Sequence, residues 1–338
     1  MKCLGLAKKI ALIAALLGMS IFVVVGCEAE DETIMFGGLG WDSAQFHNQV
    51  ARYILEHGYG YDTDEIPGET MTVFSGLERG DIDVVMEIWP ENQKEAWEGA
   101  LEDGSVEDLG VNFPDSEQGF YVPAYVVEGD EERGIEPMAE DLESIYDMCD
   151  YWELFQDPEN PDKGRFYTGL PGWEATKINE AKFEAYGLKD CFELFGPGTQ
   201  AALDSSLVSA YERGEPWFGY YWAPTPLYGK LDLYKIEEPE YDEEVWGDTY
   251  ECDYPYSQVH IAVYHDFPDR HPEIVEFLEN YETDTEMVSE ALAYMDELDV
   301  DPDQAAPEAA KWFLREREDV WTQWVSEDVA ESVKDSLN

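Results

Sequence analysis

The sequence predicts an α/β protein of two lobes with a ligand cleft between them. Short apolar segments alternate with segments of helical periodicity along most of the 338 residues, a length sufficient for two domains of ordinary size. Three tryptophans also stand near the ends of predicted strands, beside proline or glycine. Ligands of α/β proteins bind at the loops that follow the carboxyl ends of strands, so this pattern favours a binding protein.

The first 26 residues are typical of a secretory leader and are set apart from the fold. Lys2, Lys8 and Lys9 precede a run, residues 10–25, that is almost wholly apolar. The run ends in VVGC, which resembles a bacterial lipobox, and this predicts cleavage before Cys27 and acylation of that cysteine. The alternative is an uncleaved transmembrane anchor. With either, the rest of the chain lies outside the cytoplasm and is tethered to the cell membrane at one end.

The chain is extremely acidic. It has 20 lysines and arginines against 77 aspartates and glutamates, a formal net charge of −57. Nucleic acid is therefore excluded as a partner, because phosphate binding needs positive charge. Disorder is also excluded, because 44% of the residues are hydrophobic and 14% aromatic. An acidic folded protein of this kind indicates a halophilic setting, where salt screens the self-repulsion.

Cysteine and histidine spacing predicts no metal site and no cofactor. After Cys27 the chain has Cys149, Cys191 and Cys252, whose spacing matches no zinc pattern. Export permits one disulfide among these three, and the sequence leaves the pair open.

In the first part of the chain, a strand in TIMFGG leads through glycines to a helix that starts near Asp42 or Ser43 as N-cap. TMTVFSGLERGD predicts the start of a second unit of the same strand, turn and helix order. The strand DIDVVMEI then breaks at Trp89 and Pro90 and passes into a helix.

Further along, extended segments are expected at 119–127, 164–169, 217–222 and 258–267. Helices are expected at 140–156, 174–188, 199–213 and from about 271 to the C-terminus. We expect residues 31–135 and 256–338 to form lobe 1, which is discontinuous, and residues 136–255 to form lobe 2. Periodicity alone does not require the return to lobe 1.

The three tryptophans are Trp89 in MEIWPENQ, Trp173 in GLPGWEATK and Trp222 in YYWAPTP. Each alone is compatible with core packing, but the shared context favours a binding surface. A quaternary ammonium group has no N–H to donate, so indole faces and apolar contacts are what hold it. Sugars also stack on indoles, but their sites usually add many side-chain hydrogen bonds.

The segment after Trp173 predicts a helix N-terminus. The backbone N–H groups of Glu174 and Ala175 would have no partner within the helix, and such a terminus binds carboxylates. Indoles beside a helix N-terminus suit a zwitterion with a methylated ammonium at one end and a carboxylate at the other.

Four segments of the sequence resemble those of one known protein family. DIDVVMEIWPENQ, GRFYTGLPGWEATKINEAKFEAYGL and FGYYWAPTPLYGKLDLYKIEEP, with GLGWDSAQFHNQVARYILEHGYGY before them, resemble substrate-binding proteins of glycine betaine/proline betaine ABC transporters. The resemblance covers most of the mature chain in matching order. It implies a periplasmic-binding-protein fold, type II-like, with Trp89 from lobe 1 and Trp173 and Trp222 from lobe 2 forming an aromatic cage. It also implies capture of betaine, an osmoprotectant, for a membrane permease and its ATPase, with no catalysis.

The chain departs from this pattern at two positions. Some relatives have a histidine where this chain has Gln93, four residues after the first tryptophan. A small residue often follows the second tryptophan, where this chain has Glu174. Gln93 is a neutral donor that could still reach a carboxylate, whereas the side chain of Glu174 must point away from one.

Further residues are candidates to face the cleft. Trp41 and Asp42 lie in the first loop, and Glu87 lies two residues before Trp89, on the same strand face. Either acid would favour a cation over a zwitterion, which keeps choline or carnitine as alternative ligands, although both acids could instead be solvated or capping. A carbohydrate-binding protein, a glycosidase and an amino-acid-binding protein are the remaining alternatives.

Overall fold

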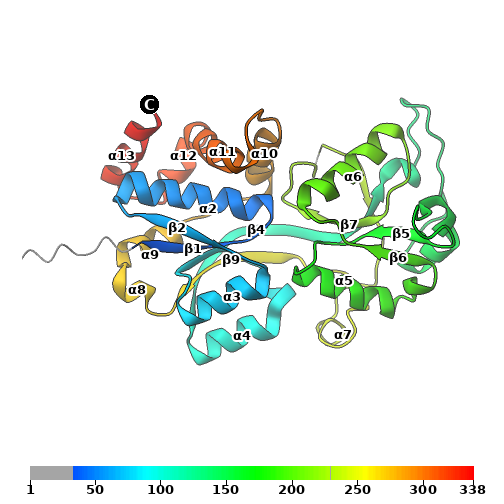
Figure 1. Ribbon diagram of the computed structural model, residues 1–338, viewed down its shortest axis with the longest axis horizontal. Coiled ribbons are helices and arrows are strands. Elements are labelled where there is room, and N and C mark those ends of the chain that lie inside the picture. Colours follow the sequence, from blue (N-terminus) through cyan, green and yellow to red (C-terminus); the bar gives the residue numbers. More distant parts are fainter. Residues whose placement is uncertain (1–32, 229) are drawn as a thin grey trace, which may run out of the picture. The chain divides into compact units, whose positions relative to one another are not determined.

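The computed structural model describes residues 33–228 and 230–338, and Cys27 and the leader lie outside these ranges (Figure 1). The strands are β1 Ile34–Gly38, β2 Thr63–Pro67, β3 Val84–Ile88, β4 Val106–Pro123, β5 Gly164–Tyr167, β6 Phe192–Phe195, β7 Gly219–Ala223, β8 Leu233–Lys235 and β9 Ser257–Tyr264. The α-helices are α2 Asp42–Ile54, α3 Thr70–Arg79, α4 Lys94–Asp103, α5 Glu174–Ala185, α6 Gln200–Arg213, α7 Glu243–Trp246, α8 Phe267–Arg270, α9 Pro272–Glu279, α10 Thr285–Asp296, α11 Pro302–Glu316, α12 Glu318–Trp321 and α13 Glu327–Leu337. A π-helical turn, η1 Leu55–Tyr59, and the 3₁₀ segments η2 Pro90–Gln93, η3 Ala124–Val126, η4 Ile145–Phe155 and η5 Leu188–Asp190 complete the described elements.

The nine strands are connected in the order β2-β1-β3-β9-β4-β7-β5-β6, with β8 beside β4. Two groups of strands are parallel: β1 pairs with β2 and β3, and β5 pairs with β6 and β7. The long strand β4 is antiparallel to β9 in one group and to β7 and β8 in the other. The carboxyl ends of β1 and β3, and those of β5 and β7, are therefore the places where the α/β rule puts a ligand site.

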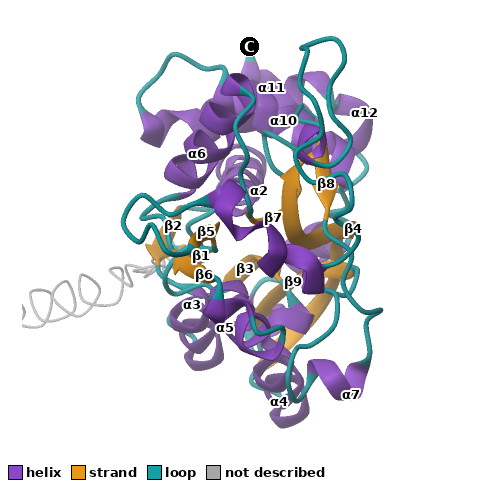
Figure 2. Ribbon diagram, turned by 90° about the vertical axis from the view of Figure 1, so that its right-hand side faces the viewer, coloured by secondary structure: helices purple, strands orange, loops and turns teal. Residues whose placement is uncertain are grey.

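Helices cover both faces of each group of parallel strands. Helices α2, α10 and α11 lie on one face of β1–β3 and helices α3 and α4 on the other, in both views (Figures 1 and 2). The apolar face of α2 was predicted from helical spacing, and Phe46, Val50 and Ile54 are indeed fully buried. In the second group, α6 and α5 lie on opposite faces of β5–β7 (Figure 1).

The structure corrects the expected second unit. Residues 70–79 form helix α3 and not an opening strand, because Val73, Phe74 and Leu77 bury one helical face. The strand beside β1 is instead β2, whose polar sequence TDEIP gives no apolar signal because it lies at the edge of the sheet. The N-cap of α2 is Trp41, so neither Asp42 nor Ser43 caps that helix.

Other predicted elements are found with shifted bounds or a different helix type. The strands near 164, 217 and 257 are β5, β7 and β9, and the helices at 174 and 199 are α5 and α6. The predicted helix at 140–156 is a 3₁₀ segment, η4, that begins with a capping box between Ser144 and Asp147. The extended segment at 119–127 is the end of the much longer β4, and its last residues turn into η3.

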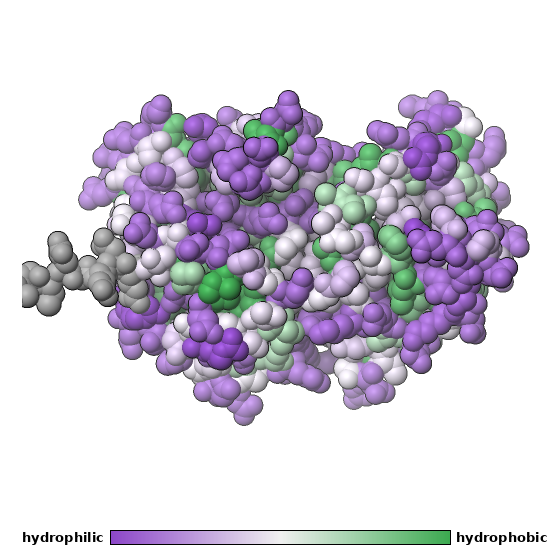
Figure 3. Space-filling view, viewed as in Figure 1, coloured by the Kyte–Doolittle hydropathy of each residue, from purple (hydrophilic) through white to green (hydrophobic). Residues whose placement is uncertain are grey.

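The surface agrees with the acidic composition. The face shown in Figure 3 is predominantly hydrophilic, with hydrophobic residues in small separate groups. The exposed large hydrophobic residues among those described are Ile66, Leu101, Tyr146, Tyr241, Tyr256 and Val300. Within residues 33–228 and 230–338, the helices are all too short or too polar to cross a membrane.

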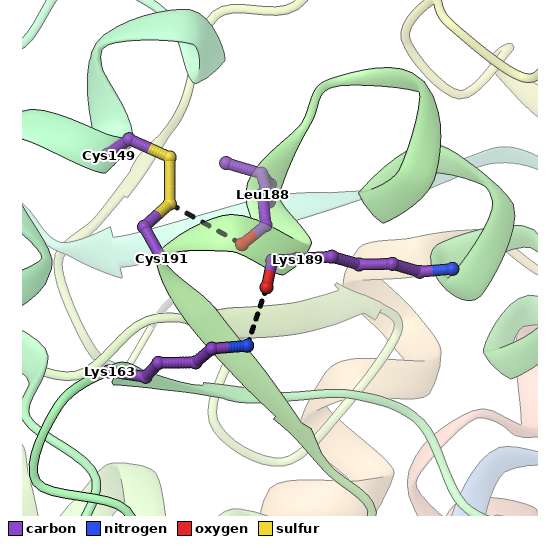
Figure 4. The surroundings of a disulfide bond; sticks show 5 residues. All are labelled: Cys149, Lys163, Leu188, Lys189 and Cys191. Atoms are coloured by element: carbon purple, nitrogen blue, oxygen red, sulfur yellow. Dashed lines mark hydrogen bonds between the residues drawn. A yellow bond between two sulfur atoms is a disulfide. The ribbon is translucent and has the colours of Figure 1, made fainter.

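The disulfide that the sequence left open joins Cys149 to Cys191, while Cys252 is a buried free thiol (Figure 4). The bond links η4 to the residue that follows η5, across 42 positions of sequence. Beside it, Lys163 Nζ donates a hydrogen bond of 2.6 Å to the carbonyl of Lys189.

We expect Cys149→Ser to lower the free energy of unfolding by about 3–4 kcal/mol, because the disulfide restricts a long loop of the unfolded chain. Urea denaturation of the wild type and the variant measures this loss. Cys252→Ser removes a thiol without opening a crosslink and serves as the control. Equal stability of the wild type and Cys149→Ser would show that the crosslink contributes nothing.

Candidate functional site

One pocket collects most of the residues that the sequence singled out. Its lining consists of Trp41, Thr70, Glu87, Trp89, Asn92, Gln93, Gln118, Trp173, Glu174, Ala175, Tyr220 and Trp222. The pocket encloses about 450 Å³ of space free of atoms, part of it open to solvent.

Four indole rings form the apolar walls. Trp41 follows β1, Trp89 follows β3, Trp173 is the N-cap of α5, and Trp222 lies within β7. The rings of Trp173 and Trp222 meet edge to face at 5.1 Å, and those of Trp41 and Trp173 do so at 5.6 Å. Such edge-to-face pairs hold one another in fixed orientations. The walls are therefore rigid and come from both groups of parallel strands.

The position of Trp173 differs from the prediction that it ends a strand. Strand β5 stops at Tyr167, and a loop carries the chain from there to Trp173. The loop holds its shape through hydrogen bonds to the carbonyl of Leu170 from the backbone N–H of Trp173, 3.1 Å, and from the hydroxyl of Thr176, 2.6 Å.

Glu87 is a carboxylate at the buried side of this pocket. Its Oε2 accepts hydrogen bonds from the indole N–H groups of Trp41, 2.6 Å, and of Trp89, 3.2 Å. Burial raises the pKa of Glu87 to about 7, and the hydrogen bonds from Trp41 and Trp89 oppose that shift. Because both indole N–H groups are engaged by Glu87, Trp41 and Trp89 offer a ligand ring faces and edges rather than donors.

A hydrogen-bonded amide pair lies on another side of the pocket. Asn92 Nδ2 donates to Gln118 Oε1 over 3.1 Å, and Gln118 Nε2 donates to Asn92 Oδ1 over 3.2 Å. The hydroxyl of Tyr220 donates to the same Gln118 oxygen over 2.7 Å, and its ring stacks on Trp222 at 5.7 Å. Tyr220 and Trp222 lie on the same face of β7, so the stacked ring of Tyr220 holds Trp222 in its orientation.

The N-terminus of α5 opens on the pocket. Among the described residues, the backbone N–H groups of Glu174 and Ala175 make no hydrogen bond, and both residues line the pocket. The side chain of Glu174 accepts a hydrogen bond of 2.5 Å from Lys177, one turn further along the helix. This ion pair offsets the charge of Glu174 at an end of the helix that favours anions.

Asp42 does not line the pocket. Its backbone N–H donates to Gln200 Oε1 over 2.9 Å, and its carboxylate accepts from Gln200 Nε2 over 3.0 Å. Burial, with the charge of Asp296, raises the pKa of Asp42 to about 6. Asp42 therefore links the start of α2 to the start of α6, outside the pocket, whereas Gln93 is buried and lines it.

Sequence reasoning did not single out Thr70, Asn92 or Gln118, and it did not decide which of Tyr220 and Tyr221 belongs to the core. Both tyrosines are buried; Tyr221 donates a hydrogen bond to Asp204 over 2.7 Å, whereas Tyr220 lines the pocket. Side chains alternate between the two faces of a strand, and Tyr220 is two residues from Trp222. The sequence could therefore have placed Tyr220 on the same face as Trp222. Asn92 lies in the segment WPENQ, which begins with Trp89. No local sequence pattern points to Gln118 on β4.

The pocket presents indole rings, side-chain amides and backbone N–H groups, which suit a small organic ligand. In the described part of the chain, no group of three or more histidine, cysteine, aspartate or glutamate side chains could hold a metal ion. Two α/β groups of strands that share one aromatic pocket define a substrate-binding protein of the two-lobed, periplasmic-binding-protein type.

Solved structures share this fold. The glycine betaine/L-proline-binding protein ProX from Borrelia burgdorferi matches with a TM-score of 0.71 at 19% identity, over 89% of this chain and 100% of that one. A choline-binding protein of an ABC transporter, in complex with choline, matches with a TM-score of 0.71 at 21% identity, over 90% and 98%. Lactococcal OpuAC in its closed form with glycine betaine matches with a TM-score of 0.67 at 19% identity, over 88% and 100%. The two-lobed α/β fold expected from the sequence is therefore confirmed.

Residues 32–316 match the family OpuAC, the substrate-binding domain of ABC-type glycine betaine transport systems. The chain belongs to this family. It is the substrate-binding component of an ABC transport system of the glycine betaine class, and its family is one of transport proteins rather than enzymes.

Proposed function

We propose that the protein captures glycine betaine, or a closely related quaternary-ammonium osmolyte, in the pocket lined by Trp41, Trp89, Trp173 and Trp222. The observation that carries this proposal is the meeting of four indoles with the N-terminus of α5 in one pocket. A methylated ammonium group binds indole faces through cation–π contact, worth about 0.5–2 kcal/mol for each face and more in a dry site.

The two ends of a betaine match the two ends of the pocket. The ammonium end takes the indole faces, and Glu87 adds a negative charge beside them. The carboxylate end takes the backbone N–H groups of Glu174 and Ala175. Gln93 supplies a neutral amide donor in the same pocket, in place of the histidine of some relatives.

Choline is the second candidate, and carnitine belongs to the same group. The specific observation in favour of choline is Glu87, because a buried carboxylate stabilises a net cation more than a zwitterion. The choline complex among the structural matches concerns another protein and adds only that the fold accommodates such a ligand. Maltose, a carbohydrate, serves as the comparison ligand in the binding test.

Titration of tryptophan fluorescence in high salt tests the proposal. Glycine betaine, proline betaine, choline, carnitine and maltose are added in turn, and we expect saturable changes with the quaternary amines and none with maltose. A response to maltose alone, or no response to any quaternary amine, would overturn the proposal.

For the cellular setting we propose an extracytoplasmic lipoprotein. The leader and Cys27 lie outside the described residues, so this rests on the sequence pattern, with the lipid on Cys27 as the membrane tether and an ABC permease with its ATPase as partners. Residues 31–135 and 256–338 would form lobe 1 and residues 136–255 lobe 2, closing on the ligand.

Replacing Cys27 by alanine tests the tether. We expect the variant to be absent from the lipidated membrane fraction, since no thiol remains to be acylated, while the wild type stays membrane-bound and incorporates labelled fatty acid. Labelling of the variant to the same extent would contradict the lipobox assignment. Replacing Cys3 in the leader by alanine provides the matched control.

A further inference from the structure

Glu87 has one oxygen that the walls of the pocket do not use. Its Oε2 holds the indole N–H groups of Trp41 and Trp89, whereas Oε1 has no hydrogen-bond partner among the described residues. Oε1 lies 3.8 Å from Nε2 of His47, and both side chains are completely buried. A buried carboxylate with an unpaired oxygen is costly, so this arrangement calls for a physical explanation.

His47 can pair with either charge state of Glu87. Burial lowers the pKa of His47 to about 3, so its ring is neutral and carries a single N–H. Its Nδ1 lies 2.8 Å from the hydroxyl of Tyr281, which can donate or accept. With the hydrogen on Nε2, the ring faces an ionised Glu87 as a donor. With the hydrogen on Nδ1, Nε2 faces a protonated Glu87 as an acceptor.

Among the described residues, neither the lining of the pocket nor the interaction partners of Glu87 include a lysine or an arginine that would fix its charge. The titratable groups that face it or share its pocket are His47 on α2, Tyr281 after α9, Glu174 on α5 and Tyr220 on β7. Burial places the pKa of Glu87 near 7, so both of its charge states are populated in neutral solution when the pocket holds no ligand.

On the basis of the proposed function, we propose that Glu87 gives up its proton when the ammonium group of the ligand enters the indole pocket. The O–H bond of the Glu87 carboxyl breaks, the proton passes to the solvent, and the electron pair stays on the carboxylate. The permanent positive charge of the ligand favours the ionised form, as any nearby opposite charge does. His47 stays neutral, with its Nε2 facing Oε1 of Glu87.

The sign of the resulting pH dependence follows from linkage. Ligand binding favours ionised Glu87, so a rise in pH, which ionises it in advance, tightens binding until the group is fully ionised in the free protein. Below that point, affinity falls by up to about tenfold for each unit of pH.

The experiment measures glycine betaine and choline binding to the full-length wild type by calorimetry at pH 7, in two buffers of different ionisation enthalpy. Fluorescence titrations between about pH 5.5 and pH 8 give the affinity profile. We expect proton release, and binding that tightens by about tenfold or more across this range. Binding at constant affinity without proton release would overturn the inference and leave the proposed function intact.

Two variants assign the effect. Glu87→Gln keeps the shape and an acceptor for the indoles, and we expect it to bind with a flat pH profile and no proton release. Asp204→Asn is the matched control, because burial raises the pKa of Asp204 to about 7 as well, yet its partner is Tyr221 and it does not line the pocket. This control should keep the wild-type profile. A pH dependence that survives in Glu87→Gln would refute the assignment, and absence of quaternary-amine binding at every pH would refute the proposed function itself.

Discussion

Replacing Trp222 by alanine is expected to weaken glycine betaine binding by about 10- to 100-fold. The variant loses one cation–π face and also the edge-to-face support that Trp222 gives to Trp173 at 5.1 Å. Tyr220, which stacks on Trp222, loses its partner as well. Isothermal titration calorimetry in high salt measures the change in Kd.

The control for this prediction is Trp312→Ala. Trp312 lies on α11 and stacks on Tyr294 at 4.7 Å, so the substitution also removes a stacked indole but leaves the pocket untouched. We expect unchanged affinity in this control and an intermediate affinity in Trp222→Phe, which keeps an aromatic face. Wild-type affinity in Trp222→Ala would remove this residue from the binding site.

The second large effect is expected at Lys182, whose side chain is fully buried in α5, the helix whose N-terminus lines the pocket. Its Nζ lies 2.8 Å from Glu238 Oε1, donates to the carbonyl of Cys252 and sits 4.7 Å from the ring centre of Tyr254. These contacts fasten the loop between β8 and β9 to α5.

We expect Lys182→Met to lower the free energy of unfolding by about 3–5 kcal/mol, because the variant leaves the Glu238 carboxylate buried without its cation. Burial already raises the pKa of Glu238 to about 6 while Lys182 opposes the shift, so the loss of Lys182 raises that pKa further. The variant should therefore be most stable at low pH and lose stability as the pH rises through the folded-state pKa of Glu238. Chemical denaturation at several pH values measures both effects.

Two comparisons isolate the buried pair. In the double variant with Lys182→Met and Glu238→Leu, much of the stability should return, because no unpaired charge remains. Lys189→Met breaks the exposed contact of Lys189 with Glu184, 2.6 Å, and should cost far less stability, because solvent screens exposed ion pairs. Equal losses in Lys182→Met and Lys189→Met would show that the burial of the pair is unimportant.

The sequence determined much of the site because its main signals are local. A strand that breaks at Trp89 and Pro90, a tryptophan before a helix N-terminus and an aromatic strand that ends at Trp222 are each visible within about ten residues. These signals located the indoles and the unpaired N–H groups of Glu174 and Ala175. Composition likewise predicted an acidic, folded chain.

Only the tertiary structure decided how distant residues meet. Gln118 and Trp222 are 104 positions apart in the sequence. Gln118 supports Trp222 because the register of β4 against β7 places the two residues opposite one another. Asp42 forms hydrogen bonds with Gln200 outside the pocket, although its neighbour Trp41 lines the pocket.

The contact between Glu87 and His47 likewise depends on how α2 packs on β3. The disulfide partner of Cys149 depends on where η4 lies against η5. Local periodicity reports the face on which a side chain lies, but strand register and helix packing, which depend on the whole core, decide what that side chain touches.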